Sequence, residues 1–219
     1  PPDYLHLNLS EKQFDWNEID RADVAIFCAG MTKVDVCEKK KISSRLVIVE
    51  NVHKLARILA DQGARIVYLS SNAVFDGSKE YPSHEDAVSP ITEYGRQKVE
   101  VEKQLIEEYP SLVTILRLTK VLGSLNPLFD DWSLALKRGD PIQPFSDMYI
   151  APIPLSFVVS VVRLVVDQNV KGILHLSGDK DFSYADIALM ASNWLGSKKD
   201  QVRPISVGES NLHESVIRS

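Results

Sequence analysis

The 219-residue sequence has few cysteines and no excess of positive charge. Its two cysteines, Cys28 and Cys37, belong to no CxxC or histidine-rich motif, which disfavours a metal site and favours a reduced, cytoplasmic protein. The formal net charge is −5, so electrostatics does not favour binding to nucleic acid or to an anionic membrane. Short basic clusters such as Lys39-Lys40-Lys41 are flanked by acids and are typical of a solvated surface.

Long hydrophobic runs and hydrolase motifs are also lacking. No signal peptide is recognised, and the most apolar stretch, Ile153–Val166, is too short to span a bilayer and contains Arg163. We expect that stretch to be a buried helix. The absence of a Gly-x-Ser-x-Gly motif disfavours a serine hydrolase.

A glycine-rich turn, which lets the backbone approach a dinucleotide pyrophosphate, is the third absence. Neither G-x-G-x-x-G nor G-x-x-G-x-x-G occurs. The sequence begins with Pro1-Pro2-Asp3, at what the pattern predicts to be a later strand of such a fold. An N-terminal βαβ unit therefore either lies outside this sequence or has been lost.

Apolar runs alternate with helical patterns along the chain. Predicted strands are 5–9, 24–28, 65–69, 112–116 and 172–176, and predicted helices are 46–62, 92–108, 128–137, 155–167 and 184–195. Residues 141–154 are predicted to form a loop or a short strand. This order predicts an α/β fold with a Rossmann-like, doubly wound parallel sheet, lacking its first βαβ unit, and a small C-terminal lobe.

Tyr94 and Lys98 lie four residues apart in a predicted helix, so they share one face. A nearby ammonium lowers the pKa of a tyrosine, which can then exchange a proton with a carbonyl or an alcohol. Ser71, at the end of an apolar run, is placed to hydrogen-bond the same oxygen. Alone, the Tyr94–Lys98 pair is more typical of an ordinary amphipathic helix; with Ser71 it predicts a carbonyl/alcohol redox site that needs a hydride carrier.

Ordered motifs accompany these residues. They are Cys28-Ala29-Gly30-Met31-Thr32-Lys33-Val34-Asp35, Ser71-Asn72-Ala73-Val74-Phe75-Asp76-Gly77, Pro90-x-x-x-Tyr94-Gly95-x-x-Lys98-x-x-x-Glu102, Arg117-x-x-x-Val121-x-Gly123 and His175-Leu176-Ser177-Gly178. Together they resemble the extended short-chain dehydrogenase/reductase family, in its dTDP-4-dehydrorhamnose reductase-like branch of the NAD-dependent epimerase/dehydratase superfamily. The resemblance runs from Leu5 to Gly196.

The resemblance implies an NAD(P)H-dependent reductase of a nucleotide-linked keto sugar, with NADP or NAD as cofactor. Tyr94 would protonate the carbonyl oxygen, Lys98 would lower the pKa of Tyr94 and bind the nicotinamide ribose, and Ser71 would orient the oxygen. Asn51 is either a satisfied buried amide or a support for a proton relay. The implied cofactor-binding residues are Asn8, Leu9, Cys28, Ala29, Gly30, Ser70, Tyr94, Lys98 and Thr119. Residues 1–123 would form the dinucleotide-binding domain and residues 124–219 mainly a small substrate-binding lobe.

Three residues depart from the rhamnose reductases at positions that face the sugar in the family. Asn72 and Ala73 replace an aspartate and a tyrosine, and Lys120 replaces a tryptophan. We hypothesise a different substrate, with an anionic group that Lys120 would meet; the alternative is that Lys120 is a surface or ion-paired lysine.

Several other residues carry plainer expectations. Cys28 is expected to be a small core residue rather than a reactive thiol, His175 to be structural, and Glu102 to make a helix-surface or helix-to-loop contact.

Two other functions stay open. One is a nucleotide-sugar epimerase of the same family, and the other is a non-catalytic regulatory or binding subunit. Retention of Ser71, Tyr94 and Lys98 favours chemistry, whereas the missing glycine turn favours a subunit. The expected partners are a nucleotide-sugar substrate and, by analogy with the family, a second copy in a homodimer; nucleic acid and membrane are not expected.

Overall fold

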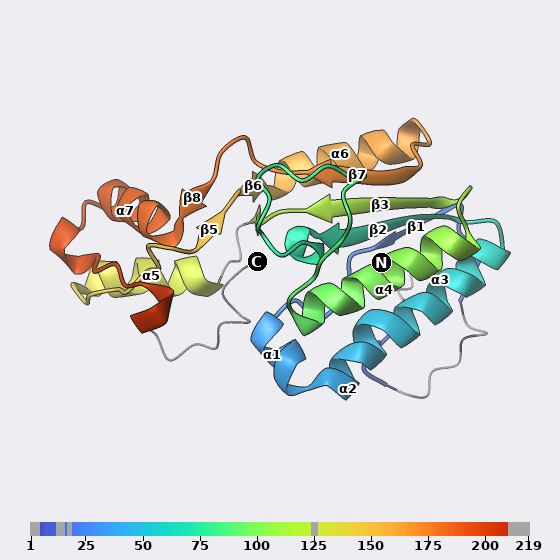
Figure 1. The fold of residues 1–219 in the computed structure, drawn as a ribbon, viewed down its shortest axis with the longest axis horizontal. Coiled ribbons are helices and arrows are strands. Elements are labelled where there is room, and N and C mark those ends of the chain that lie inside the picture. The colour runs from blue at the N-terminus through green and yellow to red at the C-terminus, as the bar shows by residue number, and fades with distance from the viewer. Residues whose placement is uncertain (1–4, 12–15, 17–18, 124–126, 210–219) are drawn as a thin grey trace. The chain divides into compact units, whose positions relative to one another are not determined.

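The computed structural model describes residues 5–11, 16, 19–123 and 127–209 (Figure 1). Its contacts divide the chain into two compact units, Pro1–Leu118 with Val161–His175, and Thr119–Ser160 with Leu176–Ser219. Residues 161–175, which the sequence-based division placed in the second lobe, thus group with the first unit. Of that lobe, residues 124–126 and 210–219 lie outside the described residues. The dinucleotide and substrate roles of the two parts stay predictions.

The first unit contains a four-stranded sheet in the order β1-β2-β3-β7. The strands are β1 (Val24–Phe27), β2 (Arg65–Ser71), β3 (Val113–Leu118) and β7 (Gly172–Leu176). β2 pairs in parallel with both β1 and β3. Every residue of β3 is buried, as expected for a strand covered on both faces. The predicted α/β fold with a Rossmann-like parallel sheet is confirmed.

Helices cover both faces of this sheet (Figure 1). α3 (Asn51–Asp61) and α4 (Glu93–Glu108) lie on one side, and the part of α6 that belongs to this unit, residues 161–167, lies on the other. The core between α3, α4 and the strands includes Val52, Ala56, Ile66, Tyr68, Val101, Leu105 and Ile115. Each helix therefore buries one apolar stripe against the strands.

A succession of helical segments leads from β1 to α3. α1 (Val34–Lys39) and α2 (Lys41–Arg45) are short, and Leu46–Glu50 forms a π-helical turn that continues into α3. The predicted helix over 46–62 therefore exists, but it begins earlier and contains this wider turn. π-turns are uncommon and are frequent near functional sites.

The second unit has a separate small core. α5 (Pro127–Arg138) and α7 (Tyr184–Leu195) confirm the two predicted helices there. Two short two-stranded sheets pair β4 (Val121–Leu122) with β6 (Ile153–Pro154), and β5 (Tyr149–Ile150) with β8 (Phe182–Ser183). The buried cluster consists of Trp132, Leu136, Ile142, Ile150, Tyr184, Ala188 and Val202.

The predicted strand over residues 5–9 is wrong. Residues 5–8 have no regular secondary structure and residues 9–10 form a turn. The Asn51 side-chain amide donates to the carbonyl oxygens of Leu9, at 2.9 Å, and Glu11, at 3.1 Å. An alternating apolar pattern describes the side chains of a strand, but a strand also needs backbone hydrogen bonds to a neighbouring strand. Here the Asn51 side chain forms the hydrogen bonds to this backbone.

The expectation of a buried helix near residues 153–166 is also wrong. In α6 (Leu155–Asp167), Val158 and Val165 are buried, whereas Phe157 and Val159 are 47% and 60% exposed. The buried pair is seven residues apart, which is two helical turns, so only one face of this apolar helix is covered.

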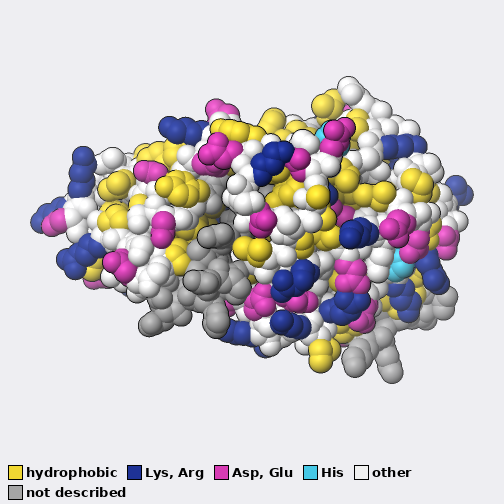
Figure 2. Space-filling view, viewed as in Figure 1, with side chains coloured by type: hydrophobic (Ala, Val, Ile, Leu, Met, Phe, Trp, Pro, Cys, Tyr) yellow, Lys and Arg dark blue, Asp and Glu magenta, His cyan; other side chains and the backbone are white. Residues whose placement is uncertain are grey.

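The charged side chains show no segregation on the face drawn in Figure 2. There, Lys and Arg side chains alternate with Asp and Glu among the described residues. Within the described part of the chain, no helix combines the length and the apolar character needed to cross a membrane.

Candidate active site

Ser71 marks the site, because it is the last residue of β2 and caps the turn that follows. Its hydroxyl oxygen accepts a hydrogen bond from the backbone N–H of Ala73, at 3.2 Å, at the start of the 3₁₀ turn Asn72–Val74. The carboxyl ends of parallel strands are where ligands bind in open α/β sheets. Ser71 therefore stands at the expected edge of the sheet.

α4 brings Tyr94 and Lys98 to the same place. Both lie on the helix face that packs on β2, and they are 9% and 7% exposed. Ser71 is near enough to Tyr94 to lower the pKa of its phenol in part. The Lys98 ammonium lies 5.7 Å from the centroid of the Tyr94 ring and donates to the carbonyl oxygen of Leu69 at 2.9 Å. The three residues singled out from the sequence thus form one cluster.

The protonation behaviour of this cluster differs from the expectation. Burial raises the pKa of Tyr94 to about 12, and the Ser71 hydroxyl lowers it only in part. Burial also lowers the pKa of Lys98 to about 8, against an opposing effect of the Glu102 carboxylate. The predicted lowering of the Tyr94 pKa by Lys98 is therefore wrong for this state of the protein. Loss of water disfavours both charged forms, and the Lys98 ammonium points to a backbone carbonyl.

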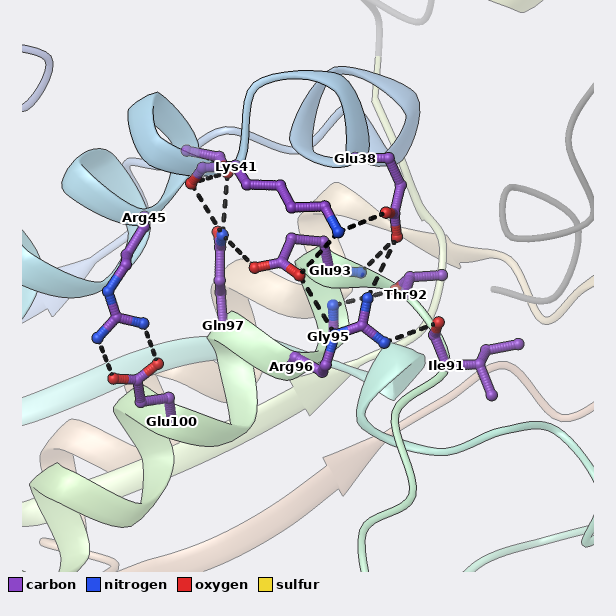
Figure 3. A network of polar contacts seen from close by, with 11 residues as sticks. Glu38, Lys41, Arg45, Ile91, Thr92, Glu93, Gly95, Arg96, Gln97 and Glu100 are labelled. Carbon is purple, nitrogen blue, oxygen red and sulfur yellow. Dashed lines mark hydrogen bonds and ion pairs between the residues drawn. The ribbon is translucent and has the colours of Figure 1, made fainter.

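The first turn of α4, which carries Tyr94, is fixed by a polar network with α1 and α2 (Figure 3). Thr92 is the N-cap of this helix, since its hydroxyl accepts from the backbone N–H of Gly95 at 3.0 Å. The Glu38 carboxylate accepts from the backbone N–H of Glu93 at 2.6 Å, and the Gln97 amide donates to Ser44 at 3.0 Å.

Gly95 permits the close approach of α4 to the turn that follows Ser71. A Cβ atom at this position would lie 2.1 Å from the carbonyl oxygen of Ala73, which is a backbone atom. Only glycine fits without a shift of the helix or of the turn. The residue next to Tyr94 therefore helps to set the position of Tyr94 relative to Ser71.

A buried ion pair lies beneath the cluster. The Arg117 guanidinium of β3 contacts both carboxylate oxygens of Glu102, with Nη2 2.7 Å from Oε2, and these residues are 5% and 2% exposed. The Ser70 hydroxyl also donates to Glu102. The expected surface or loop contact of Glu102 is wrong, because Arg117 reaches this helix face only once β3 lies beside β2.

His175 of β7 is exposed and contacts the edge of this network. One of its ring nitrogens lies 3.3 Å from Arg117 and the other 3.1 Å from the carbonyl oxygen of Pro82. Phe75 packs edge-on against the imidazole, with centroids 5.7 Å apart, and the Arg117 guanidinium stacks on the Phe75 ring.

The predicted catalytic residue Asn51 and the predicted cofactor-binding residues Asn8 and Leu9 make local structural contacts. The Asn51 amide donates its hydrogen bonds to the backbone carbonyl oxygens of Leu9 and Glu11, as a satisfied buried amide does. The Asn8 side-chain oxygen accepts from the backbone N–H of Ser10 at 3.0 Å, and its amide donates to Glu11. Leu9 belongs to the core.

The remaining predicted residues lie in three places: after β1, in the turn after Ser71, and in the second unit. Cys28, Ala29 and Gly30 are exposed just after β1, so Cys28 is not the core residue that was expected, although partial shielding raises the pKa of its thiol. In the turn after Ser71, Asn72 is exposed while Ala73 is part of the core.

Thr119 and Lys120 belong to the second unit. The Thr119 hydroxyl donates to the carbonyl oxygen of Ala151 at 2.6 Å. Lys120 is exposed, and partial shielding of its ammonium from water lowers its pKa.

Sequence reasoning missed Tyr68 as a neighbour of Lys98. Its ring centroid lies 4.5 Å from the Lys98 nitrogen, which is nearer than the Tyr94 ring. The alternation of side chains along a strand could have predicted this contact. Tyr68 and Ser70 are two residues apart, so both side chains point to the face of β2 that α4 covers.

Comparisons with known proteins identify a family and several relatives. The family model of the RmlD substrate binding domain matches residues 11–213. A dTDP-4-keto-6-deoxy-D-glucose reductase from Streptomyces niveus is 27% identical over 84% of this chain and 65% of its own length. The methionine adenosyltransferase 2 subunit beta of Xenopus laevis is 26% identical over 84% of this chain and 58% of its own length.

A solved structure shows the same fold. The dTDP-4-dehydrorhamnose reductase from Bacillus anthracis, in complex with NADP, superposes with a TM-score of 0.78 at 23% identity, covering 85% of this chain and 66% of the other. This chain thus spans less than two thirds of the length of each of these proteins. The matched family model covers the strands, α4 and most of the second unit. The chain therefore belongs to the RmlD substrate binding domain family.

Proposed function

We propose that this protein takes part in the NAD(P)H-dependent reduction of a keto group on a nucleotide-linked sugar. The observation that carries the proposal is the cluster of Ser71, Tyr94 and Lys98 at the carboxyl end of β2. It combines a proton donor, a hydroxyl that can bond the same oxygen, and a buried cation. The similarity to dTDP-sugar reductases supports the substrate class.

The residues have distinct roles in this chemistry. When bound, a reduced nicotinamide would supply the hydride that adds to the keto carbon. Tyr94 holds its proton at neutral pH, since its pKa is about 12. As the carbon–oxygen π electrons move to oxygen, that oxygen takes the Tyr94 proton while Ser71 donates a hydrogen bond to it. The Lys98 ammonium then offsets the charge left on the phenolate.

The described residues fit part of such a cofactor. Cys28–Gly30 is an exposed segment directly after β1, the strand next to β2, and a Cβ at Gly30 would meet nothing within 4 Å. Lys98 and Tyr94 supply the polar groups for the nicotinamide end. A glycine-rich turn for the pyrophosphate is absent from this sequence. Cofactor binding by the whole protein is therefore the point to test.

The test is a fluorescence titration of the protein with NADPH and with NADH. We expect the unsubstituted protein to bind one of them, Lys98→Met to bind it more weakly, and Tyr94→Phe to bind it normally. With a dTDP-4-keto-6-deoxy sugar, Tyr94→Phe should lose about 10²- to 10⁴-fold in turnover. A folded protein that binds neither nucleotide would contradict the proposal.

The sugar itself is open to a separate test. We propose that Lys120 selects a substrate with an added anionic group. We expect Lys120→Met to raise the KM for an anionic sugar nucleotide and to leave that for a neutral one unchanged. Rapid reduction of authentic dTDP-4-dehydrorhamnose by the unsubstituted protein would contradict this selectivity.

A second candidate function is that of a non-catalytic subunit. It is supported by the similarity to methionine adenosyltransferase 2 subunit beta. It predicts no turnover and a stable complex with a methionine adenosyltransferase catalytic chain, which light scattering after gel filtration would detect. The same experiment on the protein alone tests the predicted homodimer.

A further inference from the structure

Lys98 is a nearly enclosed cation with little conventional hydrogen bonding. Its side chain lies on the buried face of α4, and the residue is 7% exposed. An ammonium has three N–H donors, and the hydrogen bond described for this one goes to the carbonyl oxygen of Leu69, at 2.9 Å. Because the residue is so little exposed, groups of the protein are expected to stabilise much of the remaining charge.

Of the two aromatic rings described beside this charge, that of Tyr68 lies nearer. The Lys98 nitrogen lies 4.5 Å from the Tyr68 ring centroid and 5.7 Å from the Tyr94 ring centroid. The face of an aromatic ring is electronegative and attracts a cation within about 6 Å, most strongly where water is excluded. Tyr68 is 1% exposed, so water is excluded here.

The hydroxyl of Tyr68 contributes nothing visible to this arrangement. Among the described residues its oxygen is buried without a hydrogen-bond partner. Burial, together with Tyr94 and Glu102, raises the pKa of Tyr68 well above the ordinary value, so the phenol stays neutral. What Tyr68 offers to Lys98 is therefore its ring.

We propose that Tyr68 is a positioning residue for Lys98, whose ring holds the ammonium charged and in place beside Tyr94 at the carboxyl end of β2. The proposal rests on the proposed function only for what Lys98 does in the reduction. The contact itself belongs to this chain and needs neither cofactor nor substrate.

Within the described part of the chain, four titratable groups interact with Lys98. Tyr94 and Glu102 lie on its own helix, Cys37 lies on α1, and Tyr68 lies on β2. Burial lowers the pKa of Lys98 to about 8, and Glu102 and Cys37 act in the opposite direction. Removal of the Tyr68 ring should lower the pKa further, so that Lys98 loses its proton at a lower pH.

The test is a pH titration of the protein labelled with ¹³Cε-lysine, followed by NMR, with the Lys98 signal assigned from Lys98→Arg. In Tyr68→Phe, which keeps the ring and removes the unpartnered hydroxyl, we expect the unsubstituted midpoint. In Tyr68→Leu we expect a midpoint lower by about one pH unit. Equal midpoints in the Phe and Leu variants would overturn the proposal.

A second series covers the case in which Tyr68→Leu does not fold. Phenylalanine carrying one, two or three ring fluorines at position 68 keeps the shape while it weakens the negative face of the ring. The Lys98 midpoint should fall stepwise with fluorination, and an invariant midpoint would overturn the proposal. Because these titrations contain no nucleotide, they fail or succeed independently of the reductase hypothesis.

Discussion

Lys98 and Tyr94 respond in opposite directions to the same burial. The pKa of Lys98 is lowered from 10.5 to about 8, and that of Tyr94 is raised from 10.0 to about 12. Both changes favour the neutral side chain. For Lys98, the folded protein bears the cost of a buried charge below pH 8 and loses this cost as the pH rises to 10.5. The Tyr94 contribution to stability is present below pH 10 and is lost between pH 10 and 12.

Lys98→Met should therefore stabilise the protein. We expect the free energy of unfolding at pH 7 to rise by about 1–3 kcal/mol, because a buried charge is removed. The increase in stability between pH 8 and 10.5 should disappear. Urea denaturation at four pH values checks both points, with the exposed Lys171→Met as the matched control. An unchanged slope in Lys98→Met would contradict the assignment.

Gly95→Ala should damage the contact between α4 and the turn after Ser71. The new methyl group would lie 2.1 Å from a backbone oxygen, so we expect a loss of about 3 kcal/mol in the free energy of unfolding. Gly30→Ala, which has open space, is the control and should change stability little. Thermal and urea unfolding measure the difference; equal effects would refute the close approach.

At the scale of secondary-structure elements, α4 is held at its first turn and at its middle by polar contacts of different kinds. Its first turn contacts α1 and α2 through the network of Figure 3, and its middle contacts β3 through Glu102 and Arg117. The apolar stripe of α4, with Val101 and Leu105, supplies the packing between them. The elements thus fix Tyr94 and Lys98 against β2.

Glu102→Gln should be strongly destabilising, because it leaves the buried Arg117 charge without its partner. We expect a loss of about 3–5 kcal/mol in the free energy of unfolding. Asp167→Asn, which breaks the ion pair between Arg163 and Asp167 on the exposed face of α6, should cost less than about 1 kcal/mol. Chemical denaturation of the two variants gives the comparison. Similar small losses would show that the Glu102–Arg117 pair contributes little.

At the scale of the whole molecule, the two cysteines differ in their exposure to solvent. Cys28 is exposed after β1, whereas Cys37 in α1 is 0% exposed. A thiol reagent should therefore modify one cysteine rapidly and the second only when the first unit opens.

We expect the second modification to accelerate with added urea in parallel with loss of stability. Absorbance kinetics with a disulfide reagent measure both steps, and Cys28→Ser should remove the fast one. Rapid modification of two thiols in native conditions would contradict the burial of Cys37.

The sequence alone predicted most of the elements and the chemical type of the site. Periodicity fixed the helices over 92–108, 155–167 and 184–195, because apolar spacing is a local property of the chain. The four-residue spacing of Tyr94 and Lys98 placed them on one face, and the ordered motifs predicted the family.

Only the tertiary structure decided how those residues are surrounded. The Glu102–Arg117 pair, the ring of Tyr68 beside Lys98 and the backbone bonds of Asn51 join segments that are 15, 30 and about 40 residues apart. The absence of a strand at residues 5–9 and the half-covered α6 depend likewise on which neighbours pack there. Burial and pKa depend on distant groups and on the exclusion of water, and neither is a property of a local pattern.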